Sequence, residues 1–89
     1  MLDPDRVLQM ALALPEDDLL ILDLRYGING NYTYSLAEIA RILRITKERA
    51  RQKYCRAMDR LILALSPETP DQSILGEYLV AAVMRRKTG

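Results

Sequence analysis

The stretch that decides the fold is residues 35–65, which read SLAEIARILRITKERARQKYCRAMDRLILAL. Ser35 and Glu38 have the S-x-x-E spacing of a capping box, in which each side chain bonds to the other residue's backbone at a helix start. Apolar residues then recur at helical spacing as far as Leu43, and Thr46 offers a second N-cap soon afterwards. Two helices joined by about three residues form a helix-turn-helix. The sequence therefore predicts this motif over residues 35–65.

The turn between the two predicted helices meets most of the packing demands of the motif. Ala40 is small where the second helix must cross closely over the first, and Ala50 is small where the second helix packs back. Ile45 is apolar in the turn, where a side chain must plug into the core. Arg44, by contrast, stands where glycine would most easily adopt a left-handed backbone conformation. We therefore expect either strain or an altered turn at Arg44.

The second predicted helix separates into three faces at about 100° per residue. The inward face is apolar and consists of Ala50, Tyr54, Ala57, Met58, Leu61 and Leu65. The outward face is polar and consists of Glu48, Arg51, Gln52, Cys55, Arg56 and Asp59. Cationic side chains lie between the two faces, at Arg49, Lys53 and Arg60, where they are candidates for contacts with DNA phosphates. This arrangement is typical of a helix that sits in the major groove of DNA between two walls of phosphate.

The outward face carries the chemistry that recognises base edges. Arginine pairs with guanine, glutamine with adenine, and glutamate accepts a hydrogen bond from cytosine, so Arg51, Gln52 and Glu48 are candidate base readers. Lys47, Arg49 and Lys53 would supply attraction that does not depend on base sequence. The alternative is a charged, solvent-exposed helix in an ordinary bundle, and the coincidence of packing pattern, caps and charged faces favours DNA binding.

The rest of the chain also predicts helices, over about residues 3–14, 15–27 and 71–86. We therefore expect an all-α fold, a small bundle of about five helices that contains the helix-turn-helix. The chain of 89 residues is enough for one domain. Its predicted parts are an N-terminal helical pair and loop (1–34), the helix-turn-helix (35–65), and a linker with a C-terminal helix (66–89). Glu16, Asp17 and Asp18 are interpreted as favourable charges at a helix start.

Charge and composition exclude several classes of protein. Residues 1–40 hold two basic and seven acidic residues, whereas residues 41–60 hold eight basic and two acidic ones, so the basic charge is concentrated on the motif. Histidine is absent and Cys55 is the single cysteine, which leaves no base for a thiol nucleophile and no metal-ligand spacing. We therefore expect no enzyme activity, no cofactor and no metal. The short apolar runs and the lack of a signal peptide predict a cytoplasmic protein without membrane contact.

Several parts of the sequence closely resemble region four of the major class of bacterial sigma factors. They are Leu14-Pro15, residues 24–30 (LRYGING), residues 35–40 (SLAEIA), residues 46–52 (TKERARQ) and residues 56–58 (RAM). The resemblance covers about residues 13–62 and implies recognition of the −35 promoter element and docking on the β flap of RNA polymerase. It implies that Lys47, Glu48 and Gln52 read bases, with Arg51 also facing DNA. Arg41, Arg49 and Arg56 become candidates for contacts with the DNA backbone or an activator. The apolar surface of the two N-terminal helices, predicted over about residues 3–14 and 15–27, becomes the candidate for polymerase docking.

The sequence departs from the family pattern at three positions of the second helix of the motif. Asp59 and Ile62 stand where the family generally has basic residues, and Lys47 replaces an arginine that would bind a base in a bidentate manner. The fifth helix has no clear counterpart in the family pattern. An alternative function is therefore a sigma-like interaction module that binds polymerase or a regulator and binds DNA weakly or not at all. Its candidate partner surface comprises Asp59, Ile62, Tyr78 and Leu79. The fifth helix could instead form a homodimer seam, although completion of the core is the preferred interpretation.

Overall fold

The computed structural model describes residues 2–30, 32–66 and 71–88, and within these ranges the secondary structure is entirely helical. The helices are α1 (Pro4–Leu12), α2 (Glu16–Tyr26), α3 (Leu36–Leu43), α4 (Lys47–Ala64) and α5 (Gln72–Thr88). The predicted all-α bundle of about five helices is confirmed. Proline cannot continue a helix, so Pro67 and Pro70 predict an end of α4 in the sequence, but both lie outside the described residues.

Local capping explains where the helices of the motif begin. The Ser35 hydroxyl accepts a hydrogen bond from the Glu38 backbone N–H at 3.2 Å, and the Glu38 carboxylate accepts one from the Ser35 backbone N–H at 3.0 Å. The Thr46 hydroxyl accepts a hydrogen bond from the Arg49 backbone N–H at 3.1 Å and starts α4. Both predicted N-caps are therefore confirmed, because each depends only on residues three apart in the chain.

The turn between α3 and α4 adopts the left-handed conformation that the sequence predicted to be difficult for arginine. Arg44 has φ 58° and ψ 46°, and it is the C-cap of α3. Ala40 and Ala50 are both buried, in agreement with a close crossing of the two helices. Ile45 is only partly buried, so it plugs the turn less completely than predicted.

The core is formed by apolar side chains from all five helices and the α2–α3 loop. The fully or nearly fully buried side chains of this cluster are Val7, Leu8, Ala11, Ile21, Leu22, Ile28, Ile39, Ala57, Met58, Leu61, Leu65, Leu75, Leu79, Ala82 and Val83. Four of them belong to α5, which therefore completes the core. Helical spacing in the sequence predicts an apolar stripe on this helix, which consists of Ile74, Leu75, Tyr78, Leu79, Ala82 and Val83. The prediction is correct except at Ile74, which is exposed, and Tyr78, which is only partly buried.

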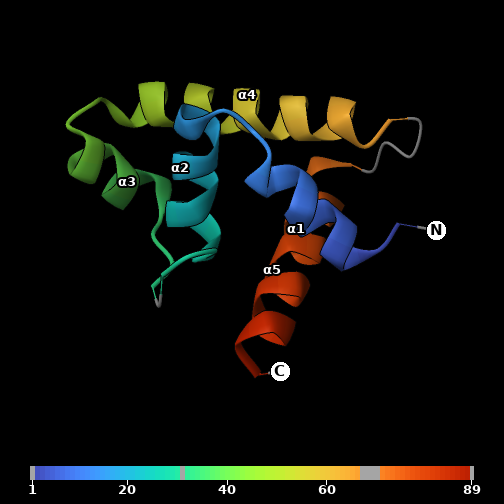
Figure 1. The fold of residues 1–89 in the computed structure, drawn as a ribbon. Coiled ribbons are helices and arrows are strands. Elements are labelled where there is room, and N and C mark those ends of the chain that lie inside the picture. The colour runs from blue at the N-terminus through green and yellow to red at the C-terminus, as the bar shows by residue number, and fades with distance from the viewer. Residues whose placement is uncertain (1, 31, 67–70, 89) are drawn as a thin grey trace.

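The helices are arranged so that the N-terminal half of α4 stands apart from α5 (Figure 1). α2 and α3 pack mainly against α4, whereas α1 packs mainly against α5. The contacts that hold the C-terminal end of α5 include an ion pair between Arg85 and Asp5 at 3.1 Å and a hydrogen bond from the Arg86 guanidinium to the backbone carbonyl of Ile28. No helix in the described ranges is long and apolar enough to cross a membrane.

A polar contact between two tyrosines links α2 and α4, and α5 packs against it. The hydroxyls of Tyr26 and Tyr54 lie 2.5 Å apart, and burial, followed by this bond, raises the pKa of Tyr26 above its usual value of 10.0. Gly76 of α5 packs on the same tyrosine, since a Cβ added at Gly76 would lie 2.7 Å from the Tyr26 hydroxyl oxygen. The absence of a side chain at Gly76 therefore allows α5 to approach α2 closely.

Candidate nucleic-acid interface

The outward face of α4 is open to solvent over its first two turns. Lys47, Glu48, Arg49, Arg51 and Gln52 are all exposed. The helix that could have covered them is α5, whose first residue Gln72 meets the second half of α4, where its amide donates to the Asp59 carboxylate at 2.8 Å. The four candidate base readers are thus brought together on an accessible surface.

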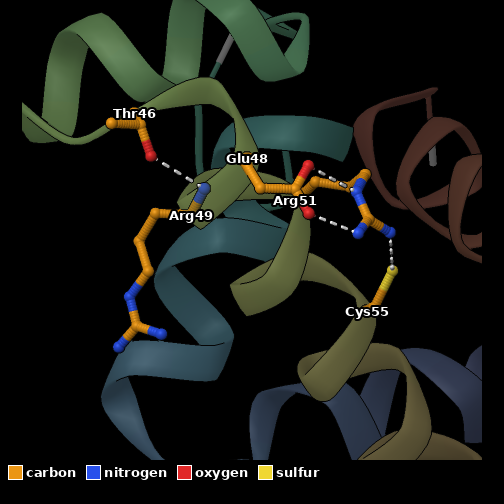
Figure 2. A network of polar contacts seen from close by, with 5 residues as sticks. All are labelled: Thr46, Glu48, Arg49, Arg51 and Cys55. Carbon is orange, nitrogen blue, oxygen red and sulfur yellow. Dashed lines mark hydrogen bonds and ion pairs between the residues drawn. The ribbon is translucent and has the colours of Figure 1, made fainter.

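Two of the candidate base readers bind each other in the free chain (Figure 2). The Arg51 guanidinium donates to both oxygens of Glu48, at 3.1 Å and 2.5 Å, and lies 4.0 Å from the sulfur of Cys55. The hydrogen bonds from Arg51 lower the pKa of the Glu48 carboxyl, and the same bonds raise the pKa of Arg51. Because both side chains are exposed, this pair costs little to open. The side chains of Glu48 and Arg51 can therefore either separate and form hydrogen bonds with other groups or remain bound to each other.

The start of α4 adds positive potential to the same surface. Backbone N–H groups in the first turn of a helix carry partial positive charge and favour nearby anions. Lys47 and Arg49 lie in this first turn, and the Arg49 side chain extends away from the Glu48–Arg51 pair (Figure 2). Arg41 is exposed on α3, one turn beyond Glu38. The Glu38 pKa is lowered mainly by hydrogen bonds with Ser35, with a smaller contribution from Arg41.

The cations in the second half of α4 have a different environment. Arg60 Nη1 lies 2.6 Å from Oδ2 of Asp18, and Arg56 Nε lies 3.8 Å from Oδ1 of the same carboxylate. Asp18 is only 1% exposed, whereas its place in the sequence beside Glu16 and Asp17 predicts a solvated charge at a helix start. A signal was available in the sequence, because Asp18 lies three and four residues before the core residues Ile21 and Leu22 and so shares their face. Lys53 is partly buried on the flank of α4.

Only part of the predicted partner surface is exposed to solvent. Asp59 is exposed and accepts from Gln72, while Ile62 and Tyr78 are partly buried and pack against the core. Leu79 is 0% exposed, so its assignment to a partner surface is wrong. The physical reason is that the apolar stripe of α5 is used within the chain to cover the bundle. Among the described residues, no group of three His, Cys, Asp or Glu side chains could hold a metal ion.

The chain is similar to known proteins over the region that forms this surface. The family model for Sigma-70, region 4 matches residues 12–61, which include α2, α3 and most of α4. RNA polymerase sigma factor SigA4 of Synechococcus elongatus is 37% identical over 59 residues, covering 65% of this chain and 19% of that protein. The chain thus corresponds to about a fifth of that relative's length, and no solved structure matches it.

The part of the chain outside the family match is an additional pair of helices. α5 and nearly all of α1 lie outside residues 12–61, and these two helices pack against each other. Because the match extends over more than half of the chain and includes both helices of the motif, the chain belongs to the sigma-70 region 4 family of helix-turn-helix domains in transcription.

Proposed function

We propose that this chain binds duplex DNA by placing the N-terminal half of α4 in the major groove of a −35-like promoter element. Lys47, Glu48, Arg51 and Gln52 are the proposed base readers, and each good base contact contributes about 1–3 kcal/mol of discrimination. The observation that carries the proposal is the solvent-exposed cluster of these four side chains on the first two turns of α4.

Phosphate contacts would place the helix in the groove. Arg41 on α3 and Arg49 and Lys53 on α4 are the proposed backbone ligands, supported by the positive N-terminal end of α4. Such contacts make the affinity fall steeply with salt concentration, because each neutralised phosphate releases bound counterions.

We further propose that the domain acts with RNA polymerase in the bacterial cytoplasm. The printed name of the relative, an RNA polymerase sigma factor, supports this partner. The proposed docking surface for the β flap is the apolar surface of α1 and α2, where Leu12 and Leu20 are exposed.

The test is a selection of bound duplexes from a random library, with and without core polymerase. The triple variant K47A/E48A/Q52A leaves the net charge unchanged and should abolish the selected sequence preference. The matched control is Q9A/E77A/K87A, which removes the same three side-chain types from exposed positions on α1 and α5. It should select the same sites as the parent chain. An unchanged preference in the first triple variant would refute the assigned base readers.

A second candidate function is a protein-interaction module with reduced DNA binding. It is favoured by α5, on which Ile74, Val80 and Met84 are exposed although the opposite side of the helix is buried. A helix with apolar residues on both sides is typically buried on both sides, so the exposed side of α5 favours a protein partner. Capture of the isolated β flap by a chain that shows no duplex binding would support this function instead.

A further inference from the structure

The first turn of α2 contains a carboxylate that the proposed DNA contacts do not use. Asp18 is 1% exposed, whereas its neighbours Glu16 and Asp17 face solvent. Its two oxygens face two arginines of α4, Arg60 at 2.6 Å and Arg56 at 3.8 Å. The contact between Asp18 and Arg60 joins residues 42 positions apart in the chain, so it fixes α2 against α4.

The three members of this cluster differ in their access to water. The side chains of Arg56 and Arg60 are 48% and 46% exposed, so either arginine can be hydrated without the aspartate. Asp18 has no such alternative, because a carboxylate removed from water is strongly destabilised unless it is paired. The described side chains include no buried N or O atom without a hydrogen-bond partner. At Asp18, Arg60 donates the hydrogen bond and Arg56 adds a longer ion pair.

Phosphate and carboxylate compete for the same guanidinium donors. Arginine binds both anions through the same planar fork of N–H groups. A DNA phosphate that took Arg60 would leave the buried carboxylate with Arg56 alone, 3.8 Å away. The aspartate therefore opposes the transfer of either arginine to DNA.

We infer that Asp18 is a positioning residue that withholds Arg56 and Arg60 from DNA phosphate. It thereby restricts phosphate binding to the N-terminal part of α4 and to α3. This inference rests on the proposed function, since it concerns the same DNA surface. It also revises the sequence-based assignment of Arg56 and Arg60 to backbone contacts.

The experiment compares D18N with D17N by fluorescence anisotropy of a labelled duplex over a salt series. Both variants remove one negative charge from the same turn, and Asp17 is exposed, so D17N controls for long-range electrostatics. Each additional phosphate contact steepens the slope of log K against log salt concentration by about 0.9. The slope for D18N should therefore be steeper than the slope for D17N by about 0.9 if one arginine is released and about 1.8 if both are. This difference is an extra loss of affinity of about 3–12-fold between 50 and 200 mM salt. A purely structural role would lower affinity without changing the slope.

A second pair of variants tests the inference if D18N does not fold. R49Q should flatten the salt slope by about 0.9, whereas R60Q should leave it unchanged because Arg60 is already bound to Asp18. Equal flattening by R60Q and R49Q would overturn the inference, as would equal slopes for D18N and D17N.

The proposed base reading and the proposed role of Asp18 can be refuted separately. A parent chain that binds duplex DNA without sequence preference would refute the proposed base reading, and the salt slopes would still decide the role of Asp18. If neither the parent chain nor a folded D18N variant bound any duplex, both proposals would be overturned. Binding by D18N alone would support the withholding of the arginines and refute promoter recognition by the parent chain.

Discussion

Replacement of Arg44 by glycine should stabilise the chain. Arg44 has φ 58° and ψ 46° at the C-cap of α3, and the left-handed region costs a residue with a Cβ about 1–2 kcal/mol. Glycine avoids this cost but loses about 0.5–1 kcal/mol more backbone entropy on folding. The net expectation is that R44G raises the free energy of unfolding by about 0–1.5 kcal/mol, centred on about 0.75 kcal/mol.

The control for this prediction is R44A, which removes the guanidinium but keeps the Cβ and hence the backbone strain. Arg44 is exposed, so R44A should lie within about 0.5 kcal/mol of the parent chain. Urea unfolding followed by far-UV circular dichroism measures the difference in the free energy of unfolding between R44G and R44A. In thermal unfolding, a gain of 1 kcal/mol corresponds to a rise of about 4–8 °C in Tm. If R44G were no more stable than R44A, the left-handed conformation would not be the source of strain, and this reasoning would be refuted.

Three further predictions concern the core, a close helix contact and a cap. L79A should lower the free energy of unfolding by about 2–5 kcal/mol in urea, whereas L63A at an exposed position of α4 should change it by less than about 0.5 kcal/mol. G76A should destabilise the chain by about 1–3 kcal/mol through contact with the Tyr26 hydroxyl, and a G76A/Y26F variant, which lacks that hydroxyl, should recover part of the loss in the same assay. Because the folded-state pKa of Glu38 is lowered from its usual value of 4.5, its contribution to stability is present above that value and is lost as the pH falls through the folded pKa. E38Q should therefore show a shallower acid limb in stability against pH, and an unchanged limb would contradict the assignment.

The helix boundaries and the motif were predictable because their causes are local. Ser35 bonds with Glu38 and Thr46 bonds with Arg49, in each case across three residues. The left-handed position at Arg44 was predictable for the same reason, since the turn geometry of the motif determines it. The exposed polar face of α4 followed from helical periodicity alone, which places Glu48 and Gln52 opposite the apolar stripe.

The sequence predicts less where a side chain has two physically reasonable uses. Asp18 could serve a helix end or an ion pair, and α5 could offer its apolar stripe to the core or to a partner. Burial decides both questions, because Asp18 is enclosed beside two arginines and Leu79 is enclosed within the bundle. Burial depends on which helices meet, and helical periodicity does not specify the meeting partners.

By itself the sequence determined the helices, their caps and the presentation of a polar face on α4, because these depend on residues within one or two turns of each other. Only the tertiary structure decided which arginines of α4 are paired with a buried carboxylate. That choice depends on the approach of α2 to α4, where a carboxylate 42 positions from Arg60 loses its water and must be paired. Because the burial of this carboxylate depends on residues far apart in the chain, no periodic pattern in the sequence predicts it.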